Sequence, residues 1–129
     1  MTGECIDALY GFFSAFGIPA WPEESVPLYD DTGAKTALPY ITVQLIAPDW
    51  RADARPFYAR VWYRDKSYDA ICAKVDEIRA AIGEGVSIPT EHGAVYIAAA
   101  DTFCQFQPYP GDTTLKCAYL SMTLSNHTI

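Results

Sequence analysis

The side chains of this sequence with the greatest intrinsic reactivity are the thiols of Cys5, Cys72, Cys104 and Cys117. They are far apart, and no C-x-x-C pair occurs, although zinc sites, redox motifs and haem attachment sites usually contain one. Each thiol has apolar neighbours in the sequence, which is typical of a reduced cysteine serving as a small core side chain. We therefore expect four free thiols, no metal site and, since no leader segment is evident, a reducing compartment.

Two imidazoles could act as bases. His92 lies in the turn-like Glu91-His92-Gly93, and His127 is close to the C-terminus. A Cys-His pair needs a helix N-terminus or a positive neighbour to lower the pKa of its thiol. The one adjacent cation, Lys116 beside Cys117, points to the opposite side of its predicted strand. The motifs G-x-S-x-G, G-x-x-x-x-G-K-[ST], G-x-G-x-x-G and H-E-x-x-H are also missing. We predict no catalytic residue, no cofactor and no enzymatic activity.

Composition and net charge indicate which kinds of protein this chain can be. The chain has 129 residues, of which 50% are hydrophobic and 19% charged, and this predicts one globular domain over residues 1–129. Nine Lys and Arg against sixteen Asp and Glu give a net charge of −7, which disfavours phosphate backbones and anionic membranes. Apolar stretches are only a few residues long. We expect no membrane insertion and no specific nucleic-acid binding.

Carboxylate pairs occur in the proline-rich connection over residues 18–38. Glu23-Glu24 and Asp30-Asp31 flank the only segment of it that could form a short strand, Val26-Pro27-Leu28-Tyr29. Carboxylates beside prolines are usually solvated turn residues, and we interpret both pairs in that way.

The spacing of apolar residues defines the elements that would position these groups. Apolar residues at three- and four-residue intervals predict helices, and strict alternation predicts strands. The expected elements are helices over residues 4–16 and 67–82 and strands over residues 40–46, 57–63, 86–89, 94–100, 103–109 and 115–125. Gly17 and Gly83 end the helices, and turns are expected at 91–93, 100–102 and 110–112. This order predicts an α+β fold, a mainly antiparallel β-sheet with two α-helices packed on one face.

Because two helices can cover only one face of such a sheet, the other face must meet water or a partner. Its predicted residues are aromatic, arginine and amide side chains: Tyr40, Tyr58, Trp62, Phe103 or Phe106, Tyr109 and Tyr119, with Arg60, Gln44, Gln105 and Gln107. Aromatic residues and Arg with few Lys or Glu are enriched at protein interfaces. The alternative is that these aromatic residues simply pack across strands, where their propensity is high.

The loop between the first two long strands is a second candidate contact. Trp50 is flanked by Arg51 and Arg55, a combination suited to gripping a neighbouring subunit. Alternatively, Trp50 folds back on its own sheet. The predicted interface residues, for a subunit or a tail, are Trp50, Arg51, Arg55, Tyr58, Arg60, Trp62 and Tyr119.

Two segments carry a family resemblance. Leu38-Pro39-Tyr40-Ile41-Thr42-Val43-Gln44 opens the first long strand, and Val61-Trp62-Tyr63-Arg64-Asp65-Lys66-Ser67-Tyr68 runs into the second helix. With the preceding helix and proline-rich stretch, this order resembles the tail-terminator and minor capsid (tail completion) proteins of tailed bacteriophages and prophages, and is lambda tail-terminator-like. The resemblance covers residues 9–124 and consists mainly of hydrophobic pattern.

The resemblance implies a structural protein of the virion tail or neck, assembled in the cytoplasm of a bacterial host. Similar proteins form a homo-oligomeric ring, commonly a hexamer, that caps the tail tube, stops its polymerisation and presents the head-docking surface. The implied partners are the tail tube protein and a head-completion protein, with DNA passing through the ring lumen. Two alternatives stay open: another neck component (a head-closure or head–tail joining protein), and a small α+β ligand-binding or enzymatic domain with Arg60 among its polar groups.

Overall fold

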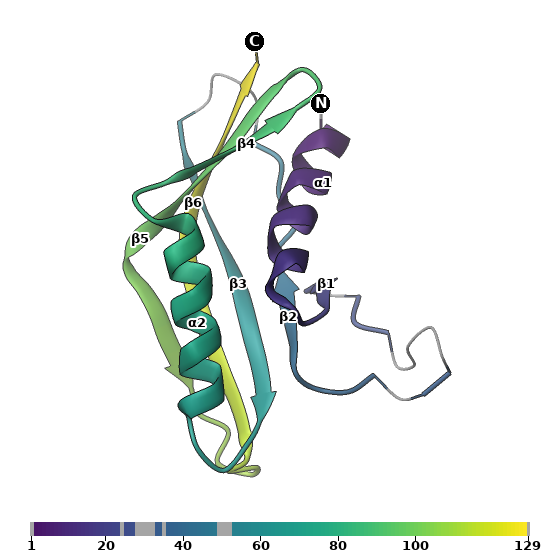
Figure 1. The fold of residues 1–129 in the computed structure, drawn as a ribbon, viewed down its shortest axis with the longest axis vertical. Coiled ribbons are helices and arrows are strands. Elements are labelled where there is room, and N and C mark those ends of the chain that lie inside the picture. Colours follow the sequence, from purple (N-terminus) through teal and green to yellow (C-terminus); the bar gives the residue numbers. More distant parts are fainter. Residues whose placement is uncertain (1, 24, 28–32, 35, 49–52, 129) are drawn as a thin grey trace.

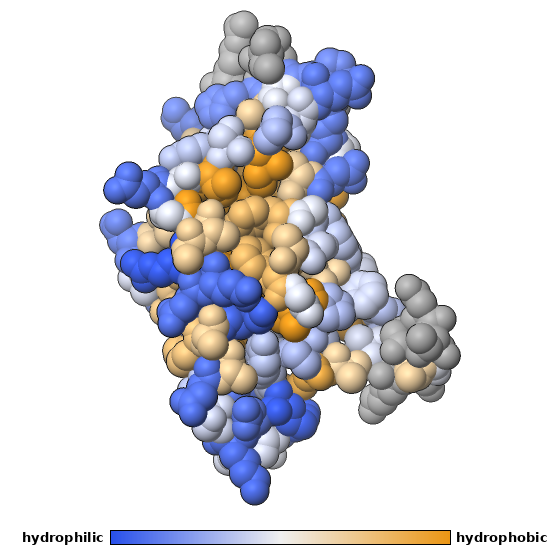
Figure 2. Space-filling model, in the orientation of Figure 1, coloured by the Kyte–Doolittle hydropathy of each residue, from blue (hydrophilic) through white to orange (hydrophobic). Residues whose placement is uncertain are grey.

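The computed structural model describes residues 2–23, 25–27, 33–34, 36–48 and 53–128. Two α-helices lie on the same side of one six-stranded sheet (Figure 1), so the predicted α+β fold is confirmed. Figure 2 views the helix-covered side, where hydrophobic residues gather between the two helices and hydrophilic residues surround them. The elements are α1 (Thr2–Phe13), a 3-10 turn (Ser14–Phe16), β1 (Ala20–Pro22), β2 (Tyr40–Val43), β3 (Arg55–Arg64), α2 (Asp69–Ile82), β4 (Val86–Thr90), β5 (Gly93–Gln107) and β6 (Leu115–Thr128).

The strand order in the sheet is β1-β2-β3-β6-β5-β4. All neighbouring strands are antiparallel except β1 and β2, which are parallel. The long strands β3 and β6 form the centre, where Ala59 pairs with Leu120 and Val61 with Ala118. These four side chains are fully buried beneath the helices.

Each helix buries one stripe of side chains. In α1 the buried residues are Cys5, Leu9 and Phe13. The chain leaves the following 3-10 turn at Gly17, the predicted end of the helix, where φ is 81° and left-handed. In α2 the buried stripe is Ile71, Val75, Ile78 and Ile82. This spacing confirms that the 3.6-residue period identified both helices.

The helix α2 begins at Asp69, two residues later than predicted. Just before the helix, the Ser67 hydroxyl accepts a hydrogen bond from the Asp69 backbone N–H at 3.3 Å. As a result Tyr68 does not join the buried stripe, and 45% of its surface is exposed.

The strands differ from the prediction at three places. The predicted turn at 100–102 is absent, because β5 continues through it as one strand with a register shift between Ala99 and Cys104. The strand predicted over residues 40–46 ends at Val43, and Leu45 is exposed. A short strand lies at Ala20–Pro22, whereas Val26 and Pro27 of the segment expected to form one have no regular structure; Leu28 and Tyr29 are outside the described residues.

In the part of the chain that the structure describes, neither helix has the combination of length and apolar sequence needed to cross a membrane.

Candidate functional site: the outer face of the sheet

The register of β3 and β6 places the predicted aromatic residues on the face away from the helices. Ala59 and Val61 face the helices, so Tyr58, Arg60 and Trp62 between and beside them face outward. Arg60 pairs with Tyr119 on β6. Each of these outward side chains is half-buried. We call the group formed by Tyr58, Arg60, Trp62, Tyr109 and Tyr119 the outer-face cluster.

Arg60 lies at the centre of the outer-face cluster. Its guanidinium carbon is 4.8 Å from the centroid of the Tyr58 ring and 5.3 Å from that of Tyr119. The two tyrosine rings stack, with centroids 5.0 Å apart and an interplanar angle of 21°. Both distances suit cation–π attraction, which is stronger where water is partly excluded.

The polar atoms of Arg60 are also satisfied. Its guanidinium forms an ion pair with Glu23, and its Nε donates a hydrogen bond to Oε1 of Gln107 at 3.2 Å. The side chains of Arg60 and Glu23 are only 23% and 18% exposed. Burial by itself would lower the pKa of Arg60, but the charge and hydrogen bond of Glu23 outweigh it and raise that pKa.

The interpretation of Glu23 as a solvated turn residue is therefore wrong. The parallel pairing of β1 with β2 brings Glu23 beside Val43, whose carbonyl accepts the Glu23 backbone N–H at 3.0 Å. From there the carboxylate reaches across β2 to Arg60. Arg60 on a half-buried strand face needs a counter-ion, but the sequence does not indicate which of its sixteen acidic residues supplies it.

Trp62 extends the cluster along β3. Its Nε1 donates a hydrogen bond to Oγ1 of Thr42 at 3.0 Å, and its ring centroid is 5.7 Å from that of Tyr109. A tryptophan with its polar atom bonded and its ring half-exposed is the kind of side chain that anchors an interface.

Cys117 lies beneath this cluster and is buried. Its Sγ is 3.5 Å from Oε1 of Gln107, and burial raises the pKa of its thiol to about 12. Burial also raises the pKa of Cys5 and, with the nearby Cys72 and Asp76 adding to it, that of Cys104. All four cysteines are free, and thiols with raised pKa values are poor nucleophiles near neutral pH.

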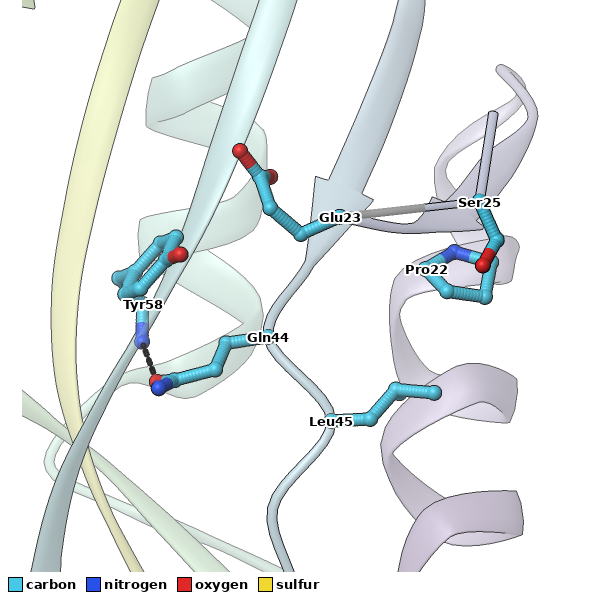
Figure 3. A pocket seen from close by; sticks show the side chains of 6 residues that line it. All are labelled: Pro22, Glu23, Ser25, Gln44, Leu45 and Tyr58. Atoms are coloured by element: carbon cyan, nitrogen blue, oxygen red, sulfur yellow. Dashed lines mark hydrogen bonds between the residues drawn. The ribbon is translucent and has the colours of Figure 1, made fainter. Parts of the chain in front are cut away.

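Beside the cluster is a hollow of about 350 Å³ at the end of β1 and β2 (Figure 3). It is lined by Pro22, Glu23, Ser25, Gln44, Leu45 and Tyr58. The Tyr58 backbone N–H donates to Oε1 of Gln44 at 3.3 Å. Among the described residues, Oε2 of Glu23 is buried and has no hydrogen-bond partner.

Other predicted interface residues lie elsewhere. Arg55 is exposed at the start of β3, paired with Leu124 and five positions before Arg60. Trp50 and Arg51 lie outside the described residues. The two alternatives for Trp50, a contact with a neighbouring subunit and packing on its own sheet, therefore stay predictions.

Neither phenylalanine proposed for the outer face lies on it. Phe103 is buried in the core, and Phe106 pairs with Ala118, whose side chain faces the helices. The register shift in β5 is the physical reason, because a shift in pairing moves side chains from one face to the other.

Neither a protein-family model nor a curated protein matches this sequence.

Far from the outer-face cluster, Glu4, Glu91 and His92 form a group whose potential ligand atoms all lie within 4.8 Å of one another. Glu4 belongs to the first turn of α1, and the two other residues to the turn between β4 and β5. Within this group, the Glu4 carboxylate forms an ion pair with Nδ1 of His92. It also accepts a hydrogen bond from the His92 backbone N–H at 3.3 Å. We assign it the role of joining α1 to that turn.

This contact predicts a pH dependence of stability. The His92 hydrogen bond lowers the pKa of Glu4 below 4.5, and the Glu4 hydrogen bond raises the pKa of His92 above 6.5. The contribution of Glu4 is complete above pH 4.5 and is lost as the pH falls through its folded pKa. That of His92 is complete below pH 6.5 and is lost as the pH rises through its folded pKa.

Melting temperatures measured across pH should therefore differ most between the wild type and His92→Gln from pH 4.5 to 6.5, and less on either side. His127→Gln, the matched control, removes the other imidazole and should show no such maximum. A difference that is constant with pH would contradict the ion-pair assignment.

Proposed function

We propose that this chain is a structural subunit of a phage or prophage tail, of the tail-terminator kind. It forms a ring at the end of the tail tube, stops polymerisation of the tube and provides the surface on which the head docks. It acts in the virion after assembly in the host cytoplasm, through binding and without catalysis. The order of elements supports this proposal, because a helix, two paired strands, a second helix and the remaining strands follow one another as in the family that the sequence resembles.

The observation that carries the proposal is the composition of the outer-face cluster. Tyr58, Trp62 and Tyr119 surround Arg60 on the sheet face opposite the two described helices, and each is half-buried. Their orientation is already fixed by stacking and hydrogen bonds, so little side-chain entropy remains to be lost on binding. Ordered aromatic and Arg side chains of this kind supply most of the binding energy at protein interfaces.

Charge is consistent with the proposed ring. With a net charge of −7, each subunit repels the DNA phosphates that would move through the lumen. DNA could then slide without being retained.

Sedimentation velocity and negative-stain electron microscopy at increasing protein concentration test the proposal. We expect closed rings with a central opening. Tyr119→Ala should weaken ring formation by about tenfold or more, because it removes an aromatic side chain from the proposed contact and one side of the stack around Arg60.

Tyr10→Ala, on the opposite layer of the molecule, is the matched control and should assemble normally. A twofold dimer or a monomer that persists at the highest concentration, and that does not bind tail tubes, would contradict the proposal.

The 350 Å³ hollow favours a second candidate, a ligand-binding domain. Glu23 would supply the polar contact, through the carboxylate oxygen that has no partner among the described residues. Thermal-shift screening with small cationic metabolites tests it: stabilisation that Glu23→Gln abolishes would favour this candidate over the ring.

A further inference from the structure

A second group of polar side chains lies where α1 meets the turn between β4 and β5. It consists of Glu4 in the first turn of α1 and of Glu91 and His92 in that turn. Figure 1 shows the N-terminal end of α1 beside this turn, and the His92 backbone N–H donates a hydrogen bond to the Glu4 carboxylate at 3.3 Å. We call these three residues the Glu4 group. Glu4 and His92 are 88 positions apart, so no local sequence motif reveals the group.

The side chains of the Glu4 group are of the types that bind a first-row transition-metal ion. An imidazole nitrogen combined with carboxylate oxygens is a ligand set of zinc, whereas calcium and magnesium take oxygen ligands. Zinc–ligand bonds of about 2.0–2.2 Å place tetrahedral ligand atoms about 3.3–3.6 Å apart. The ligand atoms of the Glu4 group all lie within 4.8 Å of one another, so small side-chain rotations bring them to one ion.

Glu91 is the member of the group that the contact between Glu4 and His92 leaves unused. In the part of the chain that the structure describes, the Glu91 carboxylate forms no hydrogen bond and no ion pair, and the residue is exposed. An ion held between the three side chains gives Glu91 an oppositely charged partner. It also joins Glu4 to His92 through the metal.

Space for an ion and its water lies beside the Glu4 group. A hollow of about 310 Å³ is lined by Glu4, Asp7, Ala8, Pro89, Thr90 and Glu91. Asp7 is exposed and adds a third carboxylate to this wall. Three carboxylates outnumber the one imidazole, so the local charge is negative whether His92 is protonated or not. This charge attracts a divalent cation, and the hollow has room for a water molecule as a fourth ligand.

We propose that Glu4, Glu91 and His92 bind one divalent transition-metal ion of the zinc type. The ion connects the first turn of α1 to the turn between β4 and β5. Because the ligands come from two distant parts of the sequence, the site exists only in the folded chain, and binding therefore stabilises the fold. The site does not include the outer-face cluster, and the inference goes beyond the proposed function without depending on it.

Isothermal titration calorimetry of the full chain with zinc chloride, after a chelator has removed bound metal, tests the site. We expect saturable binding of one ion per chain. Zinc at about a hundredfold excess over its dissociation constant should also raise the melting temperature by about 5 °C or more. A titration without saturable binding overturns the inference.

Glu91→Ala is the sharpest variant, because it removes a ligand that has no hydrogen bond or ion pair among the described residues. We expect it to weaken zinc binding by about tenfold or more, with the melting temperature of the metal-free chain unchanged. Glu84→Ala is the matched control, since it removes an exposed carboxylate just before β4, at the opposite end of that strand. It should bind zinc as the wild type does.

Spectra of the Co²⁺-loaded chain identify the ligand atoms. Nitrogen and oxygen ligands give Co²⁺ weak visible bands, whereas thiolate ligands, which are softer, add an intense near-ultraviolet band. We expect the visible bands alone, their loss in His92→Gln and their retention in His127→Gln. An intense thiolate band, or a zinc affinity that Glu91→Ala and His92→Gln leave unchanged, means that the ion binds elsewhere and overturns the inference.

Discussion

Arg60→Met is expected to lower the free energy of unfolding by about 2–4 kcal/mol, because it leaves a half-buried carboxylate without its counter-ion. Glu23 is 18% exposed and has Arg60 as its ion-pair partner, so water cannot fully replace the guanidinium. The substitution also removes the cation that contacts the rings of Tyr58 and Tyr119. Urea denaturation monitored by tryptophan fluorescence measures the change.

The double variant separates the charge effect from the packing effect. Glu23→Gln in the Arg60→Met background removes the unpaired charge, and stability should recover by about 1–2 kcal/mol. If the free energy of unfolding of Arg60→Met is within about 0.5 kcal/mol of the wild-type value, the ion pair does not stabilise the outer face of the sheet. That result would contradict the described arrangement of the outer-face cluster.

Phe13→Ala is expected to be the most damaging core substitution, with a loss of about 3–5 kcal/mol. Phe13 is fully buried, and its ring is 6.4 Å from that of Phe57 on β3, so it fixes α1 against the centre of the sheet. Its removal leaves a cavity that the surrounding strands cannot fill by small movements.

Phe12→Ala is the matched control, since Phe12 is adjacent in sequence but only half-buried, packed edge to face against Phe13 and Phe16. We expect it to cost about 1–2 kcal/mol in the same denaturation experiment. A larger loss for Phe12 than for Phe13 would contradict the described position of α1 on the sheet.

The helices and the central strands could be predicted because their patterns are long. The stripe from Ile71 to Ile82 repeats over several turns, and the alternation in β3 and β6 continues for most of each strand. Local spacing determines such elements because each buries one continuous face.

The edges of the sheet could not be predicted from local pattern. The strand β1 has three residues and exists through its parallel pairing with β2, which is a long-range contact. In β5 the residues Asp101 and Thr102 look like a turn in sequence, but pairing with β6 on both sides keeps the strand continuous. Tertiary pairing outweighs local turn preference at such positions.

For the candidate site, the sequence predicts which side chains share a face but not which touch. Alternation in β3 places Tyr58, Arg60 and Trp62 together, and the register with β6 then adds Tyr119. The contribution of Glu23 depends on the path of the chain through β1, for which the sequence contains no short-range signal. Tyr68 continues the apolar period of α2 in the sequence, yet it is 45% exposed because α2 begins only at Asp69.

Hydroxyl-radical footprinting as a function of protein concentration tests most directly the claim that the outer face is covered on assembly. The reactivities of Tyr58, Trp62 and Tyr119 are compared by mass spectrometry with that of Tyr10 on α1, the internal reference. We predict that the three outer-face side chains lose reactivity as rings form while Tyr10 keeps its own. Association that leaves all three as reactive as in the monomer would contradict the account.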